Sequence, residues 1–93
     1  MILDDLEAVL RSRLTDPPPG SYSATLLADP ERAQRKIMEE AFELCLELGR
    51  AAKREPHRAP EEAADLLFHV LAGLVGVGVG LDQVLAELEA RRG

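Results

Sequence analysis

Residues 30–54 constrain the fold more strongly than any other part of the chain. Read as a helix at about 100° per residue, the segment is apolar around most of its circumference, with its polar residues in one narrow wedge. The wedge contains Lys36, Glu39, Glu40, Glu43 and Glu47. A helix on the surface of a globular protein normally shows the opposite proportions. We therefore expect the acidic wedge, flanked by apolar surface on both sides, to face an enclosed cleft.

A second acidic pair, Glu62 and Asp65, stands near the start of the next predicted helix. His69 shares their helical face, one turn further on. Small residues continue this face: Ala72, Gly73 and Gly76. Such residues leave room either for a ligand or for the close approach of another helix.

If the two helices pack antiparallel, Glu62 and Asp65 come to lie opposite Glu40 and Glu43. Carboxylates one helical turn apart repel each other, and the repulsion grows in a partly buried cleft. Mg²⁺ relieves such repulsion, because it binds a few carboxylates and keeps positions for water and phosphate oxygens. A metal held in this way polarises a phosphoryl group. We therefore predict a Mg²⁺ site at these four carboxylates that acts on a phosphate chain.

The rest of the chain also predicts helices, and the fold class that follows is all-α. Apolar residues recur at helical spacing in residues 2–14, and residues 21–28 fit a short helical turn. Asp29 followed by Pro30 is typical of a helix start, and we expect that helix to run to about residue 54. Pro60 is expected to open the next helix, which ends near residues 75–77. A last helix is expected at 81–91. The prediction is one domain, 1–93, with four main helices in a bundle.

The size of the chain makes a stable monomer hard to build. A domain of 93 residues buries only about 60–65% of the surface that its unfolded chain exposes. Cys45 is the only cysteine, so an internal disulfide is excluded. Small scaffolds without disulfides need a metal or partner chains. We therefore expect a homo-oligomer, most simply a dimer, that buries apolar helix faces between subunits.

Charge and hydropathy exclude two classes of partner. The formal net charge is −6, with 17 acidic and 11 basic residues, so binding of nucleic acid through a basic patch is not expected. The apolar run at 66–79 is too short to span a bilayer, and no membrane partner is expected. Asp4 and Asp5 follow Met1 too closely for a secretory signal. We expect a cytoplasmic protein.

Three segments resemble one known family: residues 21–27 (SYSATLL), 36–43 (KIMEEAFE) and 62–69 (EAADLLFH). They are similar to phosphoribosyl-ATP pyrophosphatase, a member of the all-α, MazG-like nucleoside-triphosphate pyrophosphatases. Residues 80–88 resemble the last helix of that family. The resemblance implies the second step of histidine biosynthesis, in which phosphoribosyl-ATP is hydrolysed to phosphoribosyl-AMP and pyrophosphate. It also implies dependence on Mg²⁺ and a helical homodimer or higher assembly.

The resemblance also implies roles for single residues. Its metal ligands map onto Glu40, Glu43, Glu62 and Asp65. Glu39 then orients or deprotonates the attacking water, and Lys36 contacts phosphate. Tyr22 and His69 lie in the two short segments that favour phosphoribosyl-ATP over other triphosphates, and they are the further candidates for substrate binding. The chain departs from the family where Met38 replaces the usual Gly and where Phe68 replaces the commoner Tyr.

Two alternatives stay open at this point. The acidic motifs are shared by the whole superfamily, so a MazG-type enzyme that removes ordinary or damaged nucleoside triphosphates would carry them too. A helical interaction module, whose glutamates serve solubility, would also contain acidic helices. A panel of substrates separates the first alternative from phosphoribosyl-ATP hydrolysis. The second predicts no turnover and no stabilisation by Mg²⁺.

Overall fold

The chain is all-helical in the computed structural model, which describes residues 1–50 and 55–93. The described residues form five α-helices and no strand: α1 (Ile2–Thr15), α2 (Tyr22–Ala28), α3 (Pro30–Arg50), α4 (Arg58–Gly76) and α5 (Leu81–Arg91). Helix α2 is the short turn expected at 21–28, and the other four are the main helices. The predicted fold class is confirmed.

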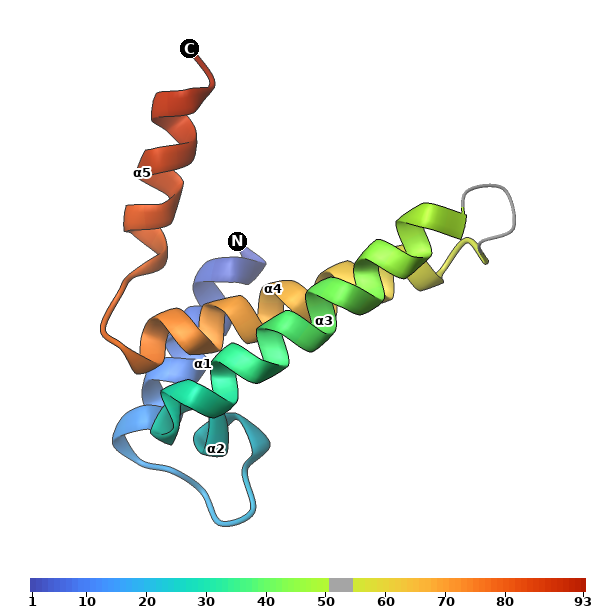
Figure 1. Cartoon of the computed structure of the whole chain (residues 1–93). Coiled ribbons are helices and arrows are strands. Elements are labelled where there is room, and N and C mark those ends of the chain that lie inside the picture. The colour runs from blue at the N-terminus through green and yellow to red at the C-terminus, as the bar shows by residue number, and fades with distance from the viewer. Residues whose placement is uncertain (51–54) are drawn as a thin grey trace.

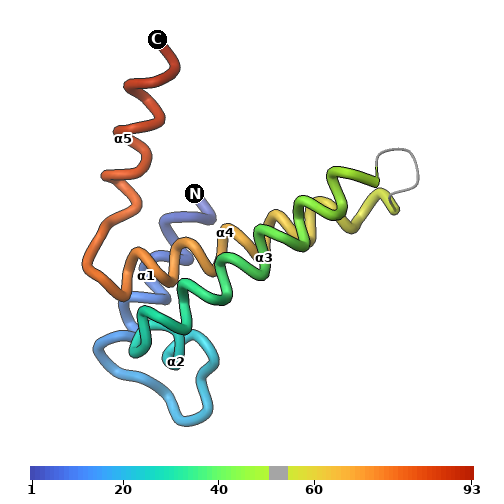
Figure 2. Tube along the Cα trace, in the orientation of Figure 1, coloured from blue at the N-terminus to red at the C-terminus, as the bar shows by residue number. Residues whose placement is uncertain are grey.

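Helices α3 and α4 form a long antiparallel hairpin (Figure 1). Helices α1 and α2 pack against the end of the hairpin where α3 begins and α4 finishes, while α5 stands away from the other helices (Figure 2). The antiparallel packing expected from the two acidic motifs is therefore present. It places residues near the end of α3 beside residues near the start of α4.

The helix starts follow local capping chemistry. The Asp29 side chain accepts the N–H of Arg32 at 3.2 Å, so Asp29 caps α3 as predicted. The predicted start of α4 at Pro60 is wrong, because the helix begins at Arg58. Proline lacks an N–H but is tolerated throughout the first turn, where that N–H has no intrahelical partner. The predicted extension of α3 over 51–54 lies outside the described residues.

The hydrophobic core lies where α1, α2, the second half of α4 and the start of α5 meet. Its buried residues are Leu10, Leu26, Leu27, Leu71, Ala72, Val75 and Leu81. Helix α5 is fixed to this core at its first residue, where the Glu7 carboxylate of α1 accepts the Leu81 N–H at 2.6 Å. Gly80 precedes that residue and has no side chain with which to cap the helix, so Glu7 supplies the missing acceptor.

The small residues of α4 serve close helix packing. Ala72 is fully buried. A Cβ at Gly76 would lie 3.1 Å from the Leu27 carbonyl of α2, and one at Gly73 would lie 3.2 Å from Ile37 of α3. Of the two uses left open by the sequence, the structure supports the approach of neighbouring helices.

One apolar face of α3 is uncovered in the single chain, whereas the sequence predicted that the acidic wedge and the apolar surface on both its sides face an enclosed cleft. Met38 is 72% exposed and Phe42 is 63% exposed, and Leu46 and Leu48 are exposed as well. The radius of gyration is 14.6 Å, compared with about 12 Å for a compact domain of this length. Helix α4 therefore covers one side of α3, and the other side lacks a neighbour.

None of the described helices is by itself long and apolar enough to cross a membrane. Helices α4 and α5 pass that test only when taken together, and they are bent by 118° at the break between them.

Candidate functional site

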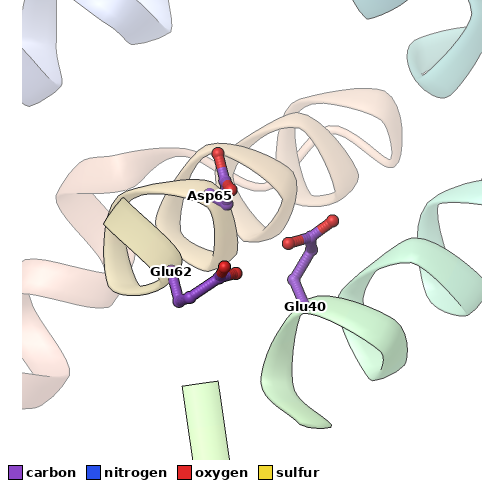
Figure 3. A group of neighbouring side chains, drawn as sticks. All are labelled: Glu40, Glu62 and Asp65. Carbon is purple, nitrogen blue, oxygen red and sulfur yellow. The ribbon is translucent and has the colours of Figure 1, made fainter. Parts of the chain in front are cut away.

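Three of the predicted metal ligands converge in the structure. Glu40 projects from α3, and Glu62 and Asp65 project from α4 (Figure 3). One carboxylate oxygen from each residue lies within 4.8 Å of the other two. We call these three residues the carboxylate cluster. Residues 22 or more positions apart in sequence meet here because the hairpin is antiparallel.

The carboxylate cluster has the properties of a cation site. Glu40 is 8% exposed and Glu62 is 5% exposed. The Oε2 atom of each is buried and has no hydrogen-bond partner in the described part of the chain. A buried carboxylate oxygen without a partner is costly, since it has lost its water and gained nothing in return. A hard divalent cation prefers oxygen ligands of this kind, so the donor set fits Mg²⁺.

Glu43, the fourth predicted ligand, lies at the edge of the carboxylate cluster. It is exposed, but its carboxyl is adjacent to that of Glu62. Burial raises the pKa of Glu62 above its ordinary value, and the adjacent Glu43 carboxyl raises it further. Like charges at short range disfavour ionisation. The structure therefore brings Glu43 beside the other three candidates without burying it.

Lys36 and Glu39 form an ion pair next to the carboxylate cluster. The Lys36 ammonium lies 3.4 Å from Glu39 and 3.7 Å from Oε1 of Glu40. Burial lowers the pKa of Lys36, but the charges of Glu39 and Glu40 outweigh that effect and leave the pKa above its ordinary value. The Glu39 carboxylate is 59% exposed. Both predicted residues thus lie at the site, with Lys36 on one of its buried carboxylates.

Tyr22 and His69 form a hydrogen-bonded pair at the other edge. The Tyr22 hydroxyl lies 2.8 Å from Nε2 of His69, and Nδ1 lies 2.6 Å from the carbonyl of Asp65. A carbonyl can only accept, so Nδ1 donates to it, and Nε2 of the neutral ring accepts from the Tyr22 hydroxyl. His69 therefore ties the tyrosine of α2 to the backbone of a carboxylate-cluster residue. The Tyr22 ring also has the Arg32 guanidinium 5.9 Å from its centre.

Sequence reasoning missed two residues of the site, Arg58 and Glu47. Arg58 lies just before the predicted helix start at Pro60, and Glu47 was placed only in the acidic wedge. In the structure the Arg58 guanidinium lies 2.9 Å from Glu62 and 3.5 Å from Glu47, which is 3% exposed. A signal was present: Arg58 precedes Glu62 by four residues and Glu47 follows Glu40 by seven, so each shares a helical face with a predicted ligand.

Comparisons with known proteins show the family of this chain. The family model described as phosphoribosyl-ATP pyrophosphohydrolase matches residues 3–92. A phosphoribosyl-ATP pyrophosphatase from Dinoroseobacter shibae is 42% identical over 93 residues, which cover 99% of this chain and 88% of the relative. The enzyme of the same name from Methanoculleus marisnigri is 40% identical, over 98% of this chain and 94% of the relative. The enzyme of the same name from Methylobacterium nodulans is 40% identical, over 96% of this chain and 81% of the relative. Almost the whole chain is matched, and it therefore belongs to the phosphoribosyl-ATP pyrophosphohydrolase family.

Proposed function

We propose that this protein hydrolyses phosphoribosyl-ATP to phosphoribosyl-AMP and pyrophosphate, the second step of histidine biosynthesis, using Mg²⁺. Membership of the family supports the substrate. The carboxylate cluster supports the chemistry, because cleavage of a phosphoanhydride needs positive charge near the phosphate oxygens.

The observation that carries the proposal is the pair of buried Oε2 atoms of Glu40 and Glu62 without hydrogen-bond partners. Glutamates that serve solubility lie on a solvated face, where their carboxylates keep their water. Here two glutamates are withdrawn from water where two helices meet, and the nearby Lys36 and Arg58 contact only their Oε1 atoms. The two buried Oε2 atoms are unfavourable unless a further cation compensates them. This disfavours the interaction-module alternative.

Glu40, Glu43, Glu62 and Asp65 would hold the metal in this proposal. When bound, Mg²⁺ supplies Lewis-acid stabilisation of the charge that develops on the phosphate oxygens. Only a few carboxylates are offered, which suits an ion that keeps several positions for water and substrate.

The remaining site residues bind and orient. Lys36 would bind phosphate, and Glu39 beside it would orient the attacking water and accept its proton. The new bond joins the water oxygen to phosphorus, the α–β phosphoanhydride breaks, and pyrophosphate leaves with the electron pair. Tyr22, held by His69, would contact the substrate outside its triphosphate.

The deciding experiment measures pyrophosphate release from phosphoribosyl-ATP, ATP and a panel of deoxynucleoside triphosphates, each with and without Mg²⁺. We expect Mg²⁺-dependent turnover of phosphoribosyl-ATP at least about 100-fold above the others. Equal turnover across ordinary triphosphates would instead establish the MazG-type alternative. Absence of turnover on every substrate would overturn the proposal.

We also propose that the protein is a homo-oligomer, most simply a dimer. Met38 and Phe42 on α3 and Leu67 on α4 are more than half exposed, and a second copy would cover them. Sedimentation equilibrium tests this: we expect at least twice the monomer mass of 10.1 kDa, and a concentration-independent monomer would contradict it. A Phe42→Glu substitution should shift the equilibrium toward monomer.

A cytoplasmic location is part of the same proposal. The substrate is a highly charged nucleotide, which does not cross membranes unaided. Cell fractionation with antibodies against the protein tests this directly, and recovery with the membrane fraction would contradict it.

A further inference from the structure

Arg58 joins the two helices of the hairpin next to the carboxylate cluster. Its Nη2 donates to Oε1 of Glu62 at 2.9 Å, within α4. Its Nε lies 3.5 Å from Oε1 of Glu47, on α3. A guanidinium offers several donors in a rigid plane, so one side chain here contacts two carboxylates from different helices.

Glu47 is the fixed end of this connection. It is 3% exposed, and Arg50 also contacts it at 3.1 Å. The Arg58 side chain is by contrast 42% exposed, and the other carboxylates that it contacts, Glu61 at 3.8 Å and Glu62 at 2.9 Å, lie on its own helix. A buried carboxylate that pairs with a partly exposed arginine restricts the arginine, because separating the pair would leave a charge buried without compensation.

The contacts of Glu62 divide its two oxygens. Oε1 accepts from Arg58, while the buried Oε2 has no hydrogen-bond partner in the described residues. Glu40 shows the same division, with Oε1 near Lys36 and Oε2 without a partner. In both residues a basic side chain contacts Oε1, and Oε2 is left to bind a metal ion at the carboxylate cluster.

We infer that Arg58, anchored by Glu47, is a positioning residue that fixes the Glu62 carboxylate in the orientation in which it binds Mg²⁺. This inference rests on the metal site proposed above. Side chains that hydrogen-bond to a metal's ligands typically change metal affinity about 10–100-fold when they are removed. A purely electrostatic effect has the opposite sign, since loss of a positive charge beside the carboxylates would strengthen cation binding.

The experiment compares Mg²⁺ binding to the chelator-treated full chain by isothermal titration with MgCl₂. The variants are Arg58→Gln, Arg58→Lys, Glu47→Gln and the double variant Glu47→Gln/Arg58→Gln. Arg50→Gln is the matched control, because Arg50 pairs with Glu47 and, within residues 1–50 and 55–93, forms no ion pair with the carboxylate cluster. Circular dichroism checks that each variant is folded. If Arg58→Gln does not fold, the Mg²⁺ affinities of Arg58→Lys and Glu47→Gln test the inference, and both should be weaker than that of the wild type.

We expect Arg58→Gln to weaken Mg²⁺ binding about 10–100-fold and Arg50→Gln to leave it unchanged. Arg58→Lys should lie between, because a single ammonium keeps the charge but not the fork that reaches two carboxylates. The double variant should bind no more weakly than Arg58→Gln if Glu47 acts through Arg58. High Mg²⁺ should restore kcat in Arg58→Gln, whereas an arginine that contacted substrate would show a raised KM that metal does not correct.

Unchanged or tighter Mg²⁺ binding by Arg58→Gln, with wild-type binding intact, overturns the positioning role and leaves the proposed function standing. Failure of the wild-type protein to bind Mg²⁺ overturns the metal site and this inference together. The two failures are therefore distinguishable by the wild-type titration.

Discussion

The two halves of α4 lie in opposite environments. Its first half carries Glu62, which is buried beside Glu40 of α3, and Asp65, which is exposed at the edge of the same cluster. Its second half packs Leu71 and Val75 against α1 and α2 in the hydrophobic core. Apolar burial stabilises the second half at roughly 25 cal/mol for each Å² removed from water, whereas burial of charge disfavours folding in the first. The stabilising core and the proposed site are thus separated along one helix.

Two carboxylates show the same contrast in their protonation. The hydrogen bond from the Leu81 N–H holds the pKa of Glu7 below its ordinary value, so folding favours its charged form. Burial raises the pKa of Glu62, so folding disfavours its charged form. Glu7 fixes α5 to the core, while Glu62 belongs to the proposed metal site. An ionised side chain can therefore support the fold at one place and strain it at another.

Asp65→Asn should have the largest effect on function and the least on the fold. The change removes the charge of a ligand but keeps its shape, and we expect kcat/KM to fall about 1,000-fold, corresponding to about 4 kcal/mol of transition-state stabilisation. Steady-state pyrophosphate release measures it. Asp82→Asn, in the first turn of α5, is the matched control and should be fully active. Normal activity of Asp65→Asn would remove Asp65 from the site.

Leu10→Ala should have the largest effect on stability. Leu10 is 1% exposed in the hydrophobic core, and truncation of such a residue lowers the free energy of unfolding by about 3 kcal/mol. Urea unfolding measures it, with Leu14→Ala in the same helix as the control, since Leu14 is 43% exposed. Activity per folded molecule should be unchanged. A loss of kcat in folded Leu10→Ala would show that the core and the site are coupled after all.

The sequence allowed the helices and the acidic pairing to be predicted because both depend on local spacing. Helical periodicity located α1 and α5. A spacing of three residues placed Glu40 and Glu43 on one helical face, and Glu62 and Asp65 on another. Arg58 was missed because its role depends on Glu47, eleven positions away and on the other helix. The sequence predicted that apolar helix faces are buried between subunits but did not show which face: periodicity shows that Phe42 is apolar, whereas the chain that covers it depends on assembly.

Mg²⁺ should stabilise the acidic half of α4 and leave the core unaffected. At about 100 times its dissociation constant, a ligand that binds only the folded state adds about 2.7 kcal/mol to the free energy of unfolding. Thermal or urea unfolding with and without MgCl₂ measures this. Glu40→Gln should abolish the gain because it removes one buried ligand. Equal stabilisation of Glu40→Gln would mean that Mg²⁺ binds elsewhere on this acidic chain.

The smallest expected effect is a pH dependence of opposite sign at Glu7 and Glu62, measured by urea unfolding in the presence of a chelator. The lowered pKa of Glu7 means that its stabilising contribution is present above the ordinary value of 4.5 and is lost as pH falls through the folded-state pKa. The advantage of wild type over Glu7→Gln should therefore shrink in acid.

The raised pKa of Glu62 means that stability is lost as pH rises through its folded-state pKa. Metal-free Glu62→Gln should therefore be more stable than wild type at neutral pH and lose that advantage in acid. Parallel pH profiles for the two variants would show that both carboxylates lie in equivalent environments, and the contrast between a carboxylate that stabilises the fold and one that destabilises it would fail.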